Sequence, residues 1–145
     1  LATQVMKQNN DEEIYNLLIT TLYKIDEGLN PMVMTNILEL KYLDYLGVGF
    51  DFNTCCKCGK KSNIVTIDPD VGGYICKNCY TNEIIYDSKT LKMLRMYYLV
   101  DIKSISELKI SDNIIKNINY FVNTYYDRYT GLYLKSKKFL NELIE

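Results

Sequence analysis

Apolar residues recur three and four positions apart along most of the chain, the spacing of amphipathic helices. The first such helix begins near residues 11–13, three acidic residues whose charge the helix dipole favours in a first turn. Its expected buried face consists of Ile14, Leu17, Leu18, Thr21, Leu22 and Ile25. A second helix is predicted to begin at Pro31 after an Asn30 cap and to end near Gly47. Its expected buried residues are Val33, Ile37, Leu40 and Leu43.

The C-terminal half repeats this pattern. Ser88 is predicted to cap a third helix that runs through Tyr98, and Ser104 with Glu107 has the spacing of a capping box that would open a short one. The longest helix is expected to begin at Ser111 or Asp112 and to end at Gly131. Its apolar face consists of Ile114, Ile115, Ile118, Phe121, Val122 and Tyr125. A last short helix, capped by Ser136, would bury Phe139, Leu140 and Leu143.

Between the second and third helices the pattern changes to that of a small β structure. Residues 64–67 read as a short strand, residues 68–70 as a turn, and Gly72 with Gly73 as a second turn. The predicted fold class is therefore mainly α, a helical domain with an inserted small β zinc ribbon. We expect residues 1–54 and 80–145 to form the helical domain and residues 55–79 to form the zinc-binding insert.

Composition limits the class of protein. The 145 residues are 48% hydrophobic and 24% charged, which is typical of one globular domain. The net charge of −1 is not that of a strongly basic DNA-binding domain, and one Zn²⁺ on four thiolates would bring it to about −3. No apolar run approaches the ~20 residues of a membrane span. The chain begins with Leu1 inside an apolar segment, which favours a fragment of a longer intracellular protein.

Two Cys-x-x-Cys pairs, Cys55 with Cys58 and Cys76 with Cys79, carry the strongest chemical signal. This separation is typical of pairs that share one structural zinc ion in a tetrahedral shell. The chain contains no histidine, so cysteine alone would hold the metal. Gly59 follows the first pair, where a knuckle turn often requires positive φ. We expect one structural Zn²⁺, with Cys56 as a bystander that points away from it.

Other interpretations of the cysteines are less favoured. A disulfide needs an oxidising compartment, yet no secretory segment is visible. A redox pair should lie near a βαβ pattern, which is absent here. Buried free thiols are a further alternative. Four thiolates leave no open position on zinc for water or substrate, so a catalytic site is not expected.

Three blocks of this sequence resemble the C-terminal part of the RecO family, bacterial recombination mediators. They are ILELKYLDYLG at residues 37–47, the cysteine insert with its DVGGYIC approach at residues 70–76, and YLKSKKFL at residues 133–140. Val48 stands where the family usually has Tyr. The blocks agree with the family in order and spacing, so the resemblance covers nearly the whole chain.

The resemblance implies a non-enzymatic role in DNA repair and homologous recombination, in the bacterial cytoplasm and at the nucleoid. The intact protein would bind single- and double-stranded DNA, mainly through an N-terminal OB-fold that this chain lacks, and would anneal complementary strands. With RecR it would load RecA onto strands coated by single-stranded DNA-binding protein, whose acidic C-terminal tail binds the helical domain in some relatives. No membrane partner is implied.

Nucleic-acid contact is predicted at Arg128, Lys135, Lys137 and Lys138, close to several tyrosines. Cations neutralise phosphates and tyrosine rings can stack on bases, although an ordinary solvated surface explains the same residues. Four lysines of the insert, Lys57, Lys60, Lys61 and Lys77, are better explained as offsetting the charge of a four-thiolate site.

A pocket for an acidic peptide could include Lys41, Tyr42 or Arg95, but surface positions on amphipathic helices explain these residues more simply. In relatives a basic residue often stands where this chain has residues 35–36, Thr-Asn, which weighs against tail binding here. The rival function is a zinc-ribbon regulatory or assembly module that acts only through protein contacts. An enzyme is the weakest interpretation, because no nucleophile lies beside a recognisable base and no Gly-rich phosphate loop is present.

Overall fold

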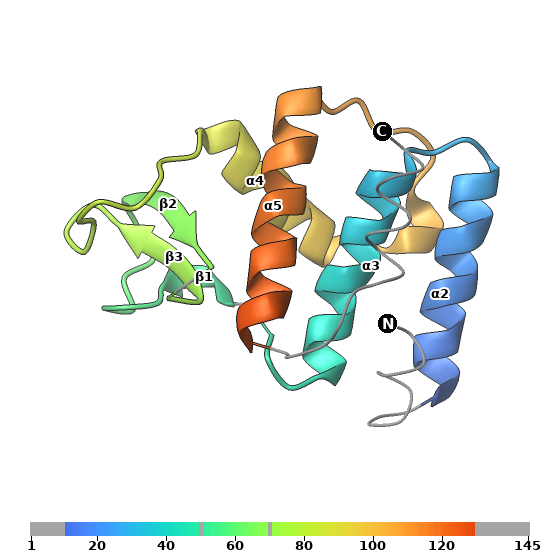
Figure 1. Ribbon diagram of the computed structural model, residues 1–145, viewed down its shortest axis with the longest axis horizontal. Coiled ribbons are helices and arrows are strands. Elements are labelled where there is room, and N and C mark those ends of the chain that lie inside the picture. Colours follow the sequence, from blue (N-terminus) through green and yellow to red (C-terminus); the bar gives the residue numbers. More distant parts are fainter. Residues whose placement is uncertain (1–10, 50, 70, 130–145) are drawn as a thin grey trace.

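The structure, a computed structural model, describes residues 11–49, 51–69 and 71–129. In chain order its elements are α2 (Asp11–Asp26), α3 (Pro31–Tyr45), β1 (Asp51–Cys55), β2 (Ile64–Asp68), β3 (Gly73–Cys76), α4 (Ser88–Leu99), the 3-10 helix η1 (Ile102–Ser104) and α5 (Asp112–Tyr129). The three strands lie at one end of the molecule and α2 at the other, with α3, α4 and α5 between them (Figure 1). The predicted fold class, mainly α with a small inserted β structure, is confirmed.

Helix α3 begins where the sequence predicts. The side chain of Asn30 accepts hydrogen bonds from the amides of Met32 and Val33, at 2.9 and 3.2 Å, and Pro31 occupies the first turn. The chain leaves the helix through Gly47, whose φ of 76° is favourable for glycine. The predicted start of α2 is also correct, but Leu22 is not on its buried face. Its side chain is 52% exposed, because it lies about 100° around the helix from the buried Thr21, on the side that faces solvent.

Two predicted helix starts are wrong. The cap of α4 is Asp87, not Ser88, because the Asp87 carboxylate accepts a hydrogen bond of 2.8 Å from the Thr90 amide. The short helix predicted from Ser104 does not form. Ser104 instead ends η1, and Ile105 follows in an extended conformation that buries its side chain, so burial prevails over the capping-box pattern. The predicted end of the longest helix at Gly131 and the predicted helix at Ser136 lie outside the described residues.

Apolar side chains from the four α-helices of the described residues form one core. The largest fully buried ones in the helical part are Ile14, Met34, Ile37, Leu40, Tyr42, Leu43, Leu94, Tyr97, Ile102, Phe121 and Tyr126. A polar group crosses the contact between α3 and α5, where the Asn36 amide nitrogen donates to Glu39 and Asn119 at 3.1 Å each. The Tyr126 hydroxyl donates to the backbone carbonyl of Glu39. Buried polar groups that bond in this way fix how two helices pack.

The three-stranded sheet has the order β1-β3-β2. β2, which contains the predicted strand at residues 64–67, pairs antiparallel with β3, with Ile67 opposite Tyr74 and Asp68 opposite Gly73. β1 pairs parallel with β3 through an irregular register that joins Asp51 to Gly73 and Cys55 to Tyr74. The sequence pattern does not predict this first strand. We call the sheet and its loops, residues 51–69 and 71–79, the β unit.

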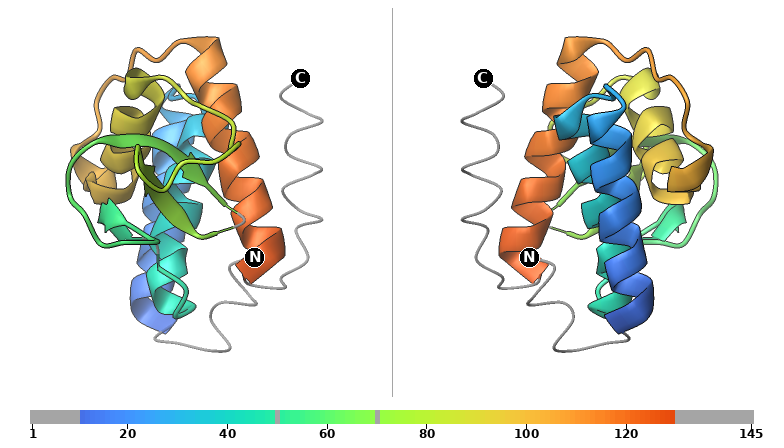
Figure 2. Two further views of the ribbon diagram at one scale, coloured as in Figure 1. Left: turned by 90° about the vertical axis from the view of Figure 1, so that its left-hand side faces the viewer. Right: turned by 90° about the vertical axis from the view of Figure 1, so that its right-hand side faces the viewer.

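Two further views show how the parts are layered. Seen from the side of the β unit, the sheet lies in front of the helices (Figure 2, left), and seen from the other side α2 lies in front (Figure 2, right). Among the described residues, no helix combines the length and the apolar character that a membrane crossing requires.

Candidate metal centre

Each Cys-x-x-Cys pair occupies a tight turn at the end of a strand. After β1, the amide of Gly59 donates to the carbonyl of Cys55 at 2.9 Å, and Gly59 has the positive φ, 78°, that the sequence predicts. After β3, the amides of Cys79 and Tyr80 donate to the carbonyl of Cys76 at 3.1 and 3.0 Å. Because β1 and β3 are parallel neighbours, the two turns lie at the same end of the sheet.

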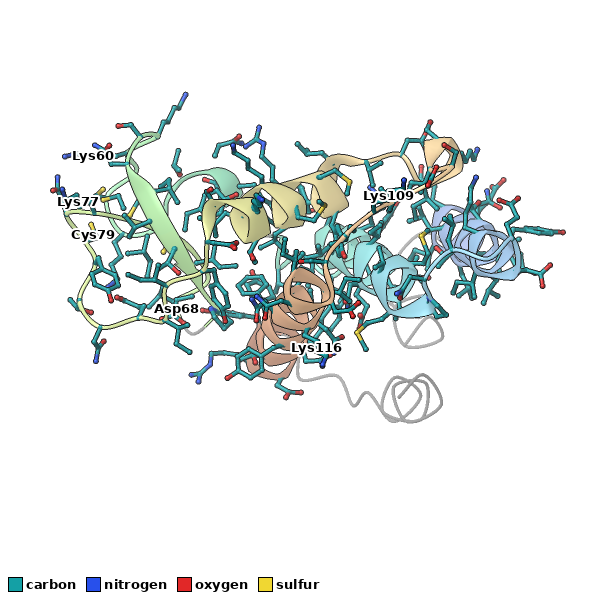
Figure 3. All side chains as sticks on the ribbon, turned by 90° about the horizontal axis from the view of Figure 1, so that it is seen from above. Lys60, Asp68, Lys77, Cys79, Lys109 and Lys116 are labelled. Carbon is teal, nitrogen blue, oxygen red and sulfur yellow. The ribbon has the colours of Figure 1, made fainter. Side chains whose placement is uncertain are left out.

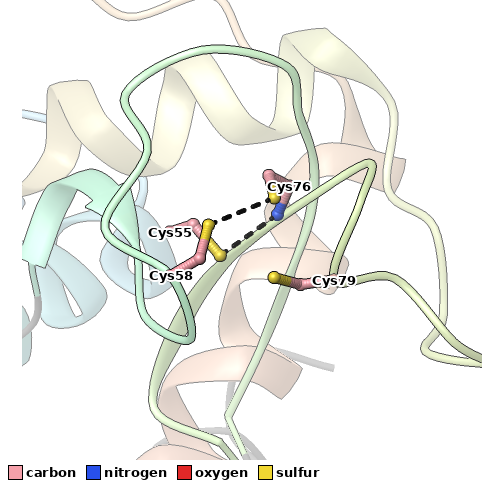
Figure 4. Close-up of side chains that lie close together, drawn as sticks. All are labelled: Cys55, Cys58, Cys76 and Cys79. Atoms are coloured by element: carbon pink, nitrogen blue, oxygen red, sulfur yellow. Dashed lines mark hydrogen bonds between the residues drawn. The ribbon is translucent and has the colours of Figure 1, made fainter.

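The structure brings together the four cysteines of the two pairs. The sulfurs of Cys55, Cys58, Cys76 and Cys79 all lie within 4.8 Å of one another. The Cys58 and Cys76 sulfurs are 3.6 Å apart, and the Cys76 amide donates to the Cys55 sulfur at 3.4 Å (Figure 4). All five cysteines are free thiols. Cys56 is exposed and does not belong to the group.

These four sulfurs fit a tetrahedral zinc ion. Zn–S bonds of about 2.3 Å place the sulfurs of such a site about 3.8 Å apart. The Cys58–Cys76 separation of 3.6 Å is close to that edge. Soft thiolates select zinc or iron–sulfur chemistry over magnesium and calcium. The arrangement can therefore hold one metal ion, and a complete sulfur shell would hold it without an open position.

The fold shifts the pKa values of the cysteine thiols in different directions. Burial raises the pKa of Cys55, but hydrogen bonds from the amides of Cys76, Lys57 and Cys58 outweigh it and bring that pKa down to about 6. Backbone amides and the neighbouring thiols likewise outweigh burial and lower the pKa of Cys76. Hydrogen bonds with Cys58 and Cys76 raise the pKa of Cys79 to about 12. The fold thus favours the thiolate form of Cys55 and Cys76 and the protonated form of Cys79, whose proton a divalent cation would replace.

Lysines surround this end of the sheet. The side chains of Lys57, Lys60, Lys61 and Lys77 are exposed. Lys60 and Lys77 lie with Cys79 at the outer end of the β unit, far from Lys109 at the helical end (Figure 3). Lys57 pairs with Glu83 at 3.3 Å, which joins the first cysteine turn to the segment that follows the second. The Thr81 amide also donates to Glu83, at 2.9 Å.

Side chains of α4 and of the sheet hold the β unit against the helices, and one of them is Arg95, which the sequence suggested only as a possible pocket residue. The Arg95 guanidinium on α4 donates to the carbonyl of Phe52 at 2.6 Å and to the Asn53 side chain at 3.2 Å. The Phe52 ring lies 4.5 Å from the ring of Tyr98 and meets Tyr74 edge-on at 5.9 Å. No sequence pattern signals these contacts, because each joins residues more than twenty positions apart.

A second set of contacts joins α5 to the residue segment that precedes β1 and to the turn that precedes β3. The Tyr125 hydroxyl donates to the carbonyl of Val48 at 2.8 Å. Gly72, in the turn before β3, comes so close to α5 that a Cβ there would lie 3.0 Å from the Tyr129 hydroxyl. Its φ of 86° also favours glycine. The four-cysteine group is therefore carried on a unit that packs directly against α4 and α5.

Of the other candidate residues that the structure describes, Arg128, Lys41 and Tyr42 do not belong to the four-cysteine group. Arg128 is exposed in the last turn of α5. Lys135, Lys137 and Lys138 lie outside the described residues. The interpretation of Tyr42 as a surface residue is wrong, because its side chain is fully buried and its hydroxyl donates to the carbonyl of Ile14. Lys41 donates to the carbonyl of Tyr98 at 3.2 Å, so it too supports the helical packing.

Comparison with known proteins places nearly the whole chain in one group of relatives. The family model described as "Recombination protein O C terminal" matches residues 1–138. Proteins named "DNA repair protein RecO" from Bacillus cereus (strain AH187) and Bacillus anthracis are each 32% identical over 145 residues, which is 98% of this chain and 58% of the relative. The chain thus spans less than two thirds of the length of these relatives. No solved structure matches.

Proposed function

The chain belongs to the recombination protein O (RecO) family, and we propose that it is the zinc-bearing C-terminal region of a DNA repair and recombination mediator. The observation that carries the proposal is the four-sulfur group, which lies within the region that the family model matches. We further propose the domain division expected from sequence, with residues 55–79 as a zinc-binding insert in a helical domain of residues 1–54 and 80–145.

In this proposal the metal has a structural role. Cys55, Cys58, Cys76 and Cys79 hold one Zn²⁺, which joins the two turns and compensates the thiolate charge. The hydrogen bonds of Arg95 and the packing of Phe52 then hold the β unit in one orientation against α4. The chain itself contributes rigid surfaces rather than a reaction, so we propose a non-enzymatic function.

The activity of the whole protein follows from the family. We propose that the intact protein binds single- and double-stranded DNA, anneals complementary strands, and works with RecR to load RecA onto strands coated by single-stranded DNA-binding protein. Its place of action would be the cytoplasm, at the nucleoid. Within this chain, Arg128, Lys135, Lys137 and Lys138 are the proposed phosphate contacts, because each side chain can neutralise one phosphate.

Annealing by the full-length protein tests this function. Its rate on complementary strands is measured for the parent and for a variant in which Lys135, Lys137 and Lys138 are alanine. We expect weaker DNA binding and a salt dependence reduced by up to about three phosphate contacts. A variant with Lys60 and Lys61 changed to alanine is the matched control. Annealing and a salt slope that are unchanged in the Lys135 variant would remove this DNA site.

A second experiment separates the mediator from a zinc module that acts only through protein contacts. A labelled acidic tail peptide of single-stranded DNA-binding protein is titrated with the zinc-loaded chain and followed by fluorescence anisotropy. Saturable binding would support recruitment through this helical domain. Absence of DNA binding by the intact protein, with or without tail binding, would favour the assembly module instead.

A further inference from the structure

Helix α2 has two apolar faces, and only one of them is buried. Ile14 and Thr21 face α3 and the core. A second face, about 100° or more around the helix from these residues, carries Tyr15, Leu22 and Tyr23, which are 53%, 52% and 67% exposed. Tyr15 and Leu22 are two turns apart, so they lie in line along the helix. An amphipathic helix of a globular protein normally presents polar residues on this side, so α2 departs from the usual pattern.

The exposed apolar side chains enclose a shallow depression. Ile19, Leu22, Tyr23 and Asp26 line a hollow of about 260 Å³. In the view from the helical end, α2 faces the viewer and no other described element lies in front of it (Figure 2, right). This face is also at the opposite end of the molecule from the β unit (Figure 1). A contiguous apolar patch with a polar rim is typical of a protein-interaction site.

Among the described residues, the charged side chains that line the hollow or flank it on the exposed side of α2 are acidic. Asp26 lines it directly, and Glu12 is exposed on the same side of α2, three residues before Tyr15. The one basic residue of α2 is Lys24, and its ammonium lies 3.7 Å from Glu27, which offsets its charge. In the sequence as a whole, residues 1–50 contain three lysines and seven acidic residues. An apolar surface with an acidic rim complements an apolar segment with a basic rim.

We propose that this face of α2, formed by Tyr15, Ile19, Leu22, Tyr23 and Asp26, docks a basic amphipathic helix of a partner protein. A helix that lies along α2 would place apolar side chains, spaced three and four apart, over Tyr15 and into the hollow beside Leu22. Its flanking lysines or arginines would lie opposite Glu12 and Asp26. This surface is separate from the four cysteines and from the proposed DNA contacts, and it does not depend on either.

The test uses the zinc-loaded chain and a designed helical peptide of about four turns (~14 residues), with leucines along one stripe and lysines beside it. Binding is measured by calorimetry and located by backbone amide NMR shifts. A peptide with every lysine replaced by glutamate tests the role of charge. We expect saturable binding of the basic peptide, shifts confined to α2 and its neighbours, and at least about tenfold weaker binding of the acidic peptide.

Surface variants locate the site. Leu22→Ser with Tyr23→Ser should weaken binding of the basic peptide by about tenfold or more, and Asp26→Lys by a smaller factor. Ile84→Ser with Ile85→Ser is the matched control, because these exposed residues lie elsewhere, and it should bind as the parent does. Circular dichroism checks that each variant is folded.

Several outcomes would overturn the proposal. Equal binding of the acidic and basic peptides would remove the electrostatic argument, and binding insensitive to the Leu22 and Tyr23 changes would place the site elsewhere. No binding of the basic peptide would contradict it directly. Self-association in sedimentation that Leu22→Ser abolishes would assign this face to a second copy of the chain instead.

Discussion

The two ends of this molecule are stabilised by different means. The helical part buries a continuous set of large apolar side chains from α2, α3, α4 and α5. The β unit buries Phe52, Ile67, Tyr74 and Ile75 in addition to two of the four grouped cysteines. A small sheet with so few buried apolar side chains usually needs a metal or disulfides to remain folded. We therefore expect folding of the β unit to depend on a bound metal ion, and folding of the helical core to depend on burial of apolar surface.

The largest expected effect follows from loss of a metal ligand. Cys58→Ser should abolish zinc binding and unfold residues 55–80, because zinc contributes about 10–16 kcal/mol of apparent binding free energy to such sites. The helical signal in circular dichroism should largely remain. Metal analysis together with amide hydrogen exchange measures both. Cys56→Ser is the matched control and should keep zinc, and a folded, metal-free Cys58→Ser protein would show that the ligand assignment is wrong.

A substitution in the helical core should destabilise the helical part and not the β unit. Leu94→Ala removes a fully buried side chain from α4 and should lower the free energy of unfolding by about 2–5 kcal/mol, from lost burial and the remaining cavity. Urea unfolding measures this change. Leu99→Ala, at a position that is 60% exposed on the same helix, should change stability by less than about 0.5 kcal/mol. Equal effects of the two substitutions would contradict the assigned core.

The junction between the two parts should respond less strongly. Arg95→Ala removes the donors to Phe52 and Asn53 and should cost about 1–3 kcal/mol, since one carbonyl loses a charged partner. Zinc should remain bound, while hydrogen exchange in β1 should become faster. Lys92→Ala, on the exposed side of α4, serves as the control. If β1 exchanged at the same rate in Arg95→Ala as in the parent, the guanidinium would not fasten the β unit.

The smallest effect concerns acid. Hydrogen bonds from the backbone amides of Thr81 and Glu83, together with Lys57, lower the pKa of Glu83 to about 2. A carboxyl group with a lowered pKa stabilises the fold above its unfolded pKa of about 4.3 and loses this contribution as pH falls toward about 2. Glu83→Gln should therefore be less stable than the parent near pH 7, and the difference should shrink below about pH 4. Urea midpoints across this range measure the difference, and one that grows toward acid would contradict the assignment.

The sequence predicts well those features that depend on neighbouring residues. Helical periodicity, the Asn30 cap and the positive φ of Gly59 are all local, and the structure agrees with each of them. The strand β1 was missed because its partner, β3, lies some twenty residues later and the pairing is parallel. The helix predicted at Ser104 was wrong because burial of Ile105 is a tertiary effect.

The same distinction applies to the candidate site. The Cys-x-x-Cys spacing alone identifies the four sulfurs that the structure groups. The contacts of Arg95 with Phe52, and of Tyr125 with Val48, could not be predicted because they depend on how the β unit lies against α4 and α5. The sequence also does not predict that Leu22 is exposed on α2. Its spacing from Leu18 and Ile25 fits the apolar pattern of a buried helix face, and only the packing against α3 shows that Thr21 is buried there instead.

Native mass spectrometry of the purified chain tests the central claim most directly, because one spectrum reports both bound metal and the oxidation state of the cysteines. We predict one zinc ion per chain and a mass without disulfide bonds, with the zinc lost only when the β unit unfolds. A metal-free chain that keeps the β unit folded, or a mass two hydrogens lower for each cysteine pair, would contradict a zinc site formed by Cys55, Cys58, Cys76 and Cys79.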